Sequence, residues 1–334
     1  MREMNDDFAK SRFDTWRCSQ SSRSRVWTAL RSAACQPRGS LGATPAMLAH
    51  ATLLRPTPLS ARARGPAHRV ASSRRASARA AASAASRPAI VVLPGLGNCT
   101  EDYDDFAAEL ESRGFHATVA RVIRPDWLRN AAGLADINYW RGTLEPRPTV
   151  DWYLGRIADA IAEAKAASGD DRVTLVAHSA GGWMARVYLN DYGVDDVRAL
   201  VSLGSPLNAV PKGVPGVVDQ TRGILTYVEA NCATPAQLGI PVTCLAGRWL
   251  EGRESVEGVR DAAGFLVGQG YKQVCGDAAA WGDGITPVAT AHLDGADNVT
   301  LEGVFHTPLG SSDDRPWYGT PAVLDRWVEK LRVA

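Results

Sequence analysis

Short apolar runs alternate with segments of helical periodicity from residue 89 onward, and this alternation limits the folds open to the chain more than any other feature. Because strands separated by helices form a mostly parallel sheet covered on both faces, the pattern predicts an α/β fold in one large domain, residues 89–334. The expected strands are Ala89–Leu93, His116–Val122, Val173–Ala177, Val197–Leu203, Val242–Ala246 and Asp297–Val304. The expected helices are Asp104–Arg113, a helix capped by Thr149 that reaches Ala164, Ala180–Tyr192 and Pro321–Arg332.

Two connections in this pattern are long, at about 124–148 and 207–241. We predict both as loop inserts, and a long loop inside a compact domain is usually functional. Both carry apolar side chains, among them Trp127, Trp140 and Val210. Such residues either roof a site or pack onto the core, and the sequence leaves both interpretations open.

The first 88 residues differ in composition and are predicted to be a disordered leader. They carry 16 Lys and Arg against 4 Asp and Glu, and 13 Arg fall within Thr15–Pro88, which has neither Lys nor an acidic residue. An Arg-rich, Ser-rich and acid-poor N-terminus is typical of an organelle transit peptide, and the alternative is a basic tail that binds anionic surfaces. The pattern is cleanest from Met47, so we expect a true start at Met47 or an upstream extension over residues 1–46. If the leader is a transit peptide, we expect it to be cleaved off near Ser86–Ala89.

Charge, hydropathy and short motifs exclude several classes of protein. The net charge of +1 combines a strongly basic leader with an acidic remainder, so bulk charge argues against nucleic-acid binding by the folded part. The longest uncharged run of the leader, between Arg38 and Arg55, is too short for a membrane span. Neither G-x-G-x-x-G nor G-x-x-x-x-G-K-[ST] occurs, which disfavours nucleotide cofactors. No CxxC spacing links the later cysteines, so a zinc site is disfavoured while a single disulfide stays open: Cys99, Cys232, Cys244 and Cys275.

The sharpest local motif is Val176–Gly182 (VAHSAGG), which joins a predicted buried strand to a predicted helix. A nucleophilic serine on a strained strand-to-helix turn needs small residues two positions before and after it, because strand and helix approach closely there. Ala177 and Gly181 satisfy this requirement, although Ala177 stands where the G-x-S-x-G pattern has glycine. The motif makes Ser179 a candidate nucleophile, and the alternative is an ordinary turn.

A serine nucleophile needs a base, and the base needs an acid that orients it. In this topology the chain order is Ser, acid, His. Only His292 and His306 follow Ser179, and His306 comes after the last predicted strand, where a base can reach the turn. Asp283 lies upstream of His306 in a Gly-Asp-Gly bend and is the candidate acid, against the alternative of a surface turn.

Two backbone N–H groups are expected to stabilise an oxyanion at this site. The Ala180 N–H follows the nucleophile directly. The Gly-rich segment after the first strand, Pro94–Gly97, lets backbone approach closely, and we predict the Leu96 N–H as the second donor. The alternative for this segment is a tight turn with no ligand role.

Several longer segments carry a resemblance to a known family: LPGLGN (93–98), VAHSAGGW (176–183), LVSLGSP (200–206), GDGITP (282–287) and GVFH (303–306). With these the chain resembles the α/β-hydrolase superfamily, within it the lipase and esterase branch that includes GPI inositol-deacylase-like proteins. It is most similar to plastid-targeted α/β-hydrolases of plants and algae, through RPDWLRNAAGL (124–134), YWRGTL (139–144) and GVPGVVDQTRG (213–223). The resemblance covers residues 89–334 and implies Ser179 as nucleophile, Asp283 as acid and His306 as base. It also implies the chloroplast as destination, with the mitochondrion second.

These features together predict an α/β-hydrolase that cleaves ester bonds through an acyl-enzyme, with a lipidic acyl ester as substrate and with neither metal nor organic cofactor. Two alternatives stay open: a thioesterase or acyltransferase on the same three residues, and a catalytically silent binding protein on a hydrolase fold. The expected partners are a small-molecule or lipid acyl ester and, transiently, a membrane surface, but no nucleic acid. The oligomeric state is left open.

Overall fold

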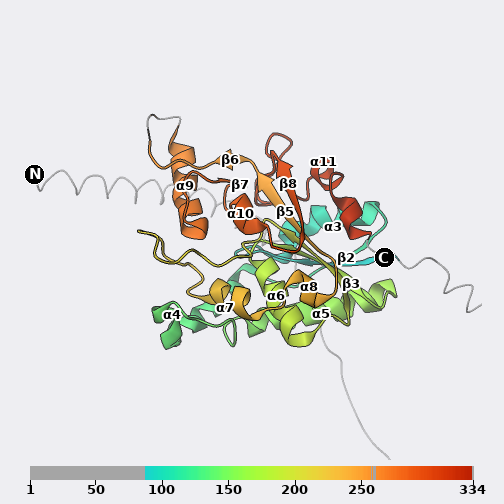
Figure 1. The fold of residues 1–334 in the computed structure, drawn as a ribbon. Coiled ribbons are helices and arrows are strands. Elements are labelled where there is room, and N and C mark those ends of the chain that lie inside the picture. The colour runs from blue at the N-terminus through green and yellow to red at the C-terminus, as the bar shows by residue number, and fades with distance from the viewer. Residues whose placement is uncertain (1–86, 257, 259–260, 333–334) are drawn as a thin grey trace, which may run out of the picture. The chain divides into compact units, whose positions relative to one another are not determined.

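The computed structural model describes residues 87–256, 258 and 261–332 (Figure 1). The predicted leader and its start at Met47 lie outside these residues, apart from Arg87 and Pro88. Six strands form one sheet in the order β2-β1-β3-β4-β5-β8, and every neighbouring pair is parallel. They are β1 (Ala89–Leu93), β2 (His116–Val119), β3 (Val173–His178), β4 (Val197–Leu203), β5 (Val242–Arg248) and β8 (Asp297–Glu302). The predicted parallel sheet is confirmed.

Strand β1 is apolar at every position because side chains on both of its faces are buried. Ala89, Val91 and Leu93 belong to one hydrophobic cluster, whereas Ile90 and Val92 belong to a second cluster. Successive side chains of a strand point to opposite faces of a sheet, so the two clusters are the two faces. All five residues have no exposed surface, which is typical of a central parallel strand covered on both sides.

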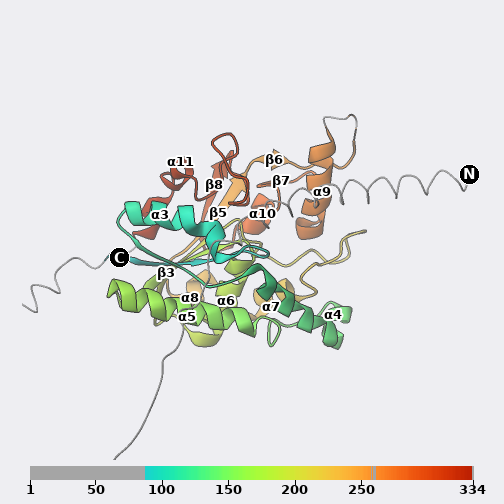
Figure 2. The same ribbon diagram turned by 180° about the vertical axis from the view of Figure 1, so that it is seen from behind.

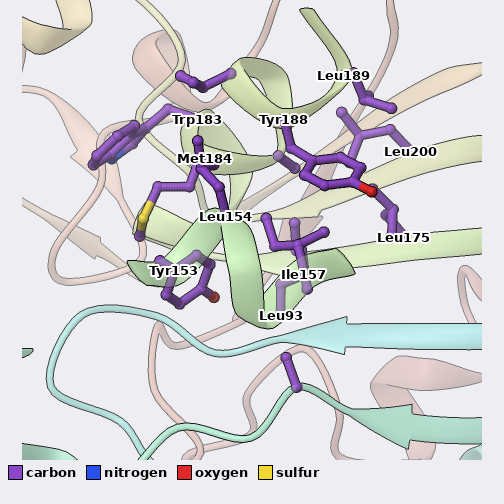
Figure 3. Packing of buried hydrophobic residues seen from close by; sticks show 14 of the residues in the cluster. Leu93, Tyr153, Leu154, Ile157, Leu175, Trp183, Met184, Tyr188, Leu189 and Leu200 are labelled. Carbon is purple, nitrogen blue, oxygen red and sulfur yellow. The ribbon is translucent and has the colours of Figure 1, made fainter. Parts of the chain in front are cut away.

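Helices cover each face of the sheet, as the sequence predicted (Figures 1 and 2). On one face, α3 (Asp104–Ser112) and the C-terminal turns α11 (Pro321–Leu324) and η4 (Val328–Leu331) bury Phe106, Leu110 and Trp327. On the other, α5 (Asp151–Ser168) and α6 (Ala180–Tyr192) pack side chains such as Ile157 and Met184 against strand residues (Figure 3). The sheet is thereby the middle layer of three.

The segment 124–148 is not the loop that we predicted. It contains η2 (Arg124–Ala135) and α4 (Ile137–Arg141). Asp126 accepts a hydrogen bond from the Ile123 N–H at 3.2 Å, and Asp136 caps α4 by accepting from the Asn138 N–H at 2.8 Å. The 3₁₀ helix η2 is too tightly wound, and α4 is too short, to leave a 3.6-residue apolar period, although Pro125 and the two aspartates are start signals.

Other predicted boundaries also need correction. The insert 207–241 contains α7 (Ile224–Asn231) and α8 (Pro235–Leu238), and the chain further on forms α9 (Ala262–Cys275), which the sequence analysis missed. The closing helix Pro321–Arg332 is two short turns, because Trp327 is buried between them and donates its Nε1–H to the Tyr318 carbonyl at 2.9 Å. Four short elements complete the order: η1 (Thr100–Tyr103), α10 (Val288–Ala291) and the antiparallel pair β6 (Leu250–Glu251) and β7 (Trp281–Gly282).

The two edge strands are shorter than predicted. The expected strand His116–Val122 ends at Val119, and Asp297–Val304 ends at Glu302. Each has a single neighbour, so pairing stops where the chain turns away from that neighbour. The disulfide that the sequence left open does not form, because all four cysteines of the described part are free thiols. None of the helices within the described ranges has the length and apolar character needed to cross a bilayer.

Candidate active site

Ser179 occupies the tight turn between β3 and α6. Its φ of 52° lies in the left-handed region that L-residues other than glycine rarely adopt, which marks a strained backbone. The turn is tight because the helix starts directly over the preceding strands. A Cβ on Gly181 would come within 2.8 Å of the Leu93 carbonyl oxygen, so only glycine fits there. Of the two small residues singled out by the sequence, Gly181 is therefore required by close packing.

The structure brings the predicted base to this serine. His306 Nε2 lies 3.0 Å from Ser179 Oγ, and His306 Nδ1 lies 2.7 Å from Asp283 Oδ2. A carboxylate oxygen only accepts hydrogen bonds, so the ring proton sits on Nδ1 and the bare Nε2 accepts from the serine hydroxyl. This is the tautomer that a general base needs.

Asp283 is fully buried and every donor around it is fixed. Its Oδ1 accepts from the backbone N–H groups of Ile285 at 3.0 Å and Thr286 at 2.7 Å. Its Oδ2 accepts from His306 and from the Tyr318 hydroxyl at 2.8 Å. The Gly-Asp-Gly bend thus supplies backbone donors to the carboxylate, and the alternative of a surface turn is wrong because the side chain has no exposure.

The loop after β1 is clamped at one peptide bond by two buried tyrosines. Tyr153 of α5 donates to the Pro94 carbonyl at 2.5 Å, while the Gly95 N–H of the same peptide donates to Tyr103 Oη at 2.9 Å. The next carbonyl, that of Gly95, accepts from the Asn98 N–H at 3.0 Å. Because a trans peptide points its C=O and N–H in opposite directions, the Leu96 N–H faces away from Asn98.

Leu96 and Ala180 both line the cavity that opens beside Ser179. Within the described part of the chain, neither of their N–H groups has a hydrogen-bond partner. The Ala180 N–H is also the first of α6, whose N-terminus carries a partial positive charge. Both predicted donors therefore belong to residues that border the cavity beside Ser179 and have no partner for the N–H within the described ranges.

The cavity beside Ser179 has a volume of about 500 Å³. It is lined mainly by apolar side chains from α6 and from both inserts, including Trp127, Leu144, Trp183, Met184, Val210 and Leu225. The sequence left open whether apolar residues of the inserts pack onto the core or roof a site, and Trp127 and Val210 do both. They are buried and they also line the cavity. Trp140 does neither, since 66% of its surface is exposed.

Three polar residues near Ser179, His306 and Asp283 were not predicted from the sequence: Tyr318, Tyr103 and His178. Tyr318 accepts from the Gly247 N–H at 2.7 Å and donates to Asp283. The hydroxyl oxygen of Tyr103 forms a hydrogen bond with Nδ1 of His178, the residue before Ser179, at 2.7 Å. Burial raises the pKa of Tyr103 and of Tyr318 above the ordinary tyrosine range and lowers the pKa of His178 well below 6.5. In the sequence, the signals for these contacts are limited to the Gly-rich segment Pro94–Gly97 and to the position of His178 next to Ser179.

The other histidine that follows Ser179 in the sequence, His292, lies away from this centre. His292 is half-buried near Thr300, 3.4 Å from its hydroxyl, and makes no contact with the serine. No group of three or more His, Cys, Asp or Glu residues in the ranges 87–256 and 261–332 is arranged to hold a metal ion.

Comparison with known proteins agrees with this architecture. A family model described as the alpha/beta hydrolase fold matches residues 88–231, from the start of β1 to the end of α7. With the parallel sheet and the strand–serine–helix turn, this match shows that the chain has the α/β-hydrolase fold. The matched range contains Ser179 and ends before Asp283 and His306.

Solved structures with a similar chain path are remote in sequence. The lin2722 gene product of Listeria innocua is 17% identical, with 74% of this chain and 96% of that chain covered at a TM-score of 0.42. A candidate lipase, lip1, from Acinetobacter baumannii AYE is 15% identical, covering 74% and 84% at 0.36. Tomato methylketone synthase I, solved with 2-tridecanone, is 9% identical, covering 74% and 99% at 0.35. Similarities this low carry no information about activity. No curated protein matches the chain.

Proposed function

We propose that the chain is a serine hydrolase that cleaves carboxylic esters with an apolar acyl group through an acyl-enzyme. The observation that carries this proposal is the hydrogen-bonded series Ser179–His306–Asp283, with 3.0 Å and 2.7 Å between the polar atoms. The order along the chain and the proton positions match the roles of nucleophile, base and orienting acid.

The proposed reaction has two halves. Ser179 Oγ attacks the ester carbonyl while its proton passes to His306 Nε2, and the negative oxygen is stabilised by the N–H groups of Leu96 and Ala180. His306 then returns this proton to the leaving alkoxide, so that an alcohol departs and the acyl group stays on Ser179. Water attacks the acyl-enzyme with the same base, and the carboxylic acid and free serine are released.

The cavity supports an apolar acyl group as the part of the substrate that is recognised. Its volume of about 500 Å³ lies in the ordinary range for small-molecule sites. Each methylene moved from water into such a cavity gains about 0.8 kcal/mol. A lipidic ester is thus favoured over a small polar one, and a thioester with the same acyl group fits the same residues.

The first experiment measures hydrolysis of p-nitrophenyl esters from acetate to decanoate by the full chain and by Ser179→Ala. We expect kcat/KM to rise with acyl length and Ser179→Ala to lose essentially all activity. A fluorophosphonate probe should label the wild type at Ser179, as located by mass spectrometry. Ser168→Ala is the matched control, because this hydroxyl bonds the Ala164 carbonyl at the far end of α5.

Three outcomes separate the alternatives. A folded chain with neither hydrolysis nor labelling supports the silent binding protein. Hydrolysis that persists in Ser179→Ala contradicts the proposed nucleophile. Faster turnover of acyl thioesters, or acyl transfer to an added alcohol in preference to water, supports a thioesterase or an acyltransferase instead of an esterase.

A further inference from the structure

A chain of buried hydrogen bonds links the oxyanion loop to the backbone of the base. The Gly95 N–H donates to Tyr103 Oη at 2.9 Å. Tyr103 Oη lies 2.7 Å from His178 Nδ1, and His178 Nε2 lies 2.8 Å from the His306 carbonyl oxygen. Tyr103 and His178 are fully buried, and neither lines the cavity beside Ser179. These two side chains, the Tyr103–His178 bridge, therefore act on the site without reaching a substrate.

Only one arrangement of protons satisfies this bridge. The His306 carbonyl can only accept, so His178 carries its proton on Nε2 and leaves Nδ1 as an acceptor. The Tyr103 hydroxyl must then donate to Nδ1, and its oxygen lone pair accepts from Gly95. Every polar atom of the bridge then has a partner. A second proton, on His178 Nδ1, would leave the Tyr103 hydroxyl between two donors with no acceptor for its own proton.

Both ends of the bridge hold a group that the proposed reaction needs. At one end, Gly95 sits directly against His178 and Ser179, since a Cβ there would lie 2.9 Å from His178 Nδ1 and 2.8 Å from Ser179 Cβ. This contact fixes the loop that presents the Leu96 N–H. At the other end, the His306 N–H donates to the Asp283 carbonyl at 3.0 Å, and its C=O accepts from His178. The backbone of the base is therefore held on both sides.

The charge of His178 matters because its ring lies close to the ring of the base. The two ring centres are 4.8 Å apart, and Trp317 forms a T-shaped pair with His178, with 5.7 Å between their ring centres. Tyr103 and His306 are the titratable groups in contact with it. Burial, followed by the nearby His306, lowers the pKa of His178 well below 6.5. A neutral His178 leaves His306 free to take a proton, whereas a charged one would repel the imidazolium that forms.

We propose that Tyr103 and His178 are positioning residues of the hydrolase, which hold the Leu96 donor loop and His306 in one fixed relation across the active site. The proposal rests on the proposed ester hydrolysis by Ser179. This role differs from general packing because the Tyr103–His178 bridge links two groups that act only in the transition state. Loss of the bridge should therefore lower kcat and leave KM nearly unchanged.

The test compares Tyr103→Phe, His178→Gln and the double variant with the wild type. Tyr103→Phe removes one oxygen and leaves the Gly95 N–H and His178 Nδ1 without partners, so we expect kcat to fall about tenfold with KM within about twofold. The inhibition constant of a trifluoromethyl ketone, which forms a tetrahedral adduct with the serine, should rise by the same factor. The double variant should be no slower than His178→Gln alone, because both residues belong to one chain of contacts.

Tyr188→Phe is the matched control, since this buried tyrosine of α6 stacks on Tyr192 and faces neither the loop nor the base. The positioning role is overturned if folded Tyr103→Phe keeps the wild-type kcat, or if kcat falls only in proportion to the folded fraction. Multiplicative losses in the double variant also overturn it. If His178→Gln does not fold, Tyr103→Phe and the ketone decide alone. A wild type without Ser179-dependent hydrolysis refutes the proposed function itself, which keeps the two failures distinct.

Discussion

Replacing Asp283 by asparagine tests the proton arrangement of the site. Asp283 Oδ1 accepts from two backbone N–H groups, which cannot turn around, so the amide NH₂ of the variant must take the place of Oδ2. At this position the amide NH₂ meets the proton on His306 Nδ1, the atom that lies 2.7 Å from Asp283 Oδ2 in the wild type. The imidazole must then move its proton to Nε2, where it faces Ser179 and can no longer accept.

The size of the expected loss follows from this forced tautomer. In a serine protease the same exchange lowers kcat by about 10⁴, and at about 1.4 kcal/mol per factor of ten this corresponds to about 5 kcal/mol of transition-state stabilisation. The fold should survive, because the amide keeps the shape of the carboxylate and the two backbone donors keep their acceptor. We therefore expect a folded but nearly inactive Asp283→Asn.

The assay is the initial rate with saturating p-nitrophenyl butyrate, with thermal unfolding measured by circular dichroism on the same samples. Asp170→Asn is the matched control, since its carboxylate also accepts a backbone N–H, that of Ala89 at 3.3 Å, at the opposite end of the strands. It should stay within about twofold of the wild type. A folded Asp283→Asn with kcat within tenfold of the wild type would refute the reasoning.

Three further predictions follow. Gly95→Ala should lower kcat by roughly 100-fold, because its Cβ would lie 2.8 Å from Ser179 Cβ and push the donor loop away; unchanged kcat would contradict that packing. In the wild type, kcat/KM should rise by up to about fourfold for each methylene added to the acyl chain. Val210→Phe should narrow the cavity, so that this rise ends at a shorter acyl chain while hydrolysis of the acetate ester is unaffected. If the wild type and the variant show the same dependence on chain length, this cavity is not the acyl site. His178 is held neutral in the folded chain, whereas the unfolded chain protonates it below about pH 6.5. The free energy of unfolding measured in urea should therefore fall as pH drops below 6.5, by up to about 1.4 kcal/mol per pH unit, and His178→Gln should remove this component.

The strands and the candidate nucleophile were predictable because each has a local signature. A run such as Val173–Ala177 followed by Ser179 and Gly181 combines apolar character, small residues and a helix start within a dozen positions. His306 was predictable as a candidate from chain order, since only two histidines follow Ser179, and Asp283 from its Gly-Asp-Gly bend upstream of His306. The structure brings these three together over more than a hundred residues of sequence.

The supporting residues could not be predicted because their partners are set by tertiary packing. Tyr318 meets Asp283 only where the chain folds back after β8, and Tyr103 meets His178 only across β1 and β3. Nothing in their neighbouring sequence distinguishes them from ordinary core tyrosines. The helices of 124–148 were missed for a different reason, because η2 is a tightly wound 3₁₀ helix and α4 has only five residues, so neither leaves a 3.6-residue apolar period.

The position of β8 makes the base the most easily lost part of the site. This strand pairs with β5 alone, Leu301 is its single buried residue, and His306 follows it within four residues. Edges of this kind open as separate cooperative units at a lower free energy than global unfolding. Hydrolysis should therefore decline at urea concentrations where α5 and α6 are still helical, so that the rate of turnover measures local opening of one sheet edge and not the integrity of the whole domain.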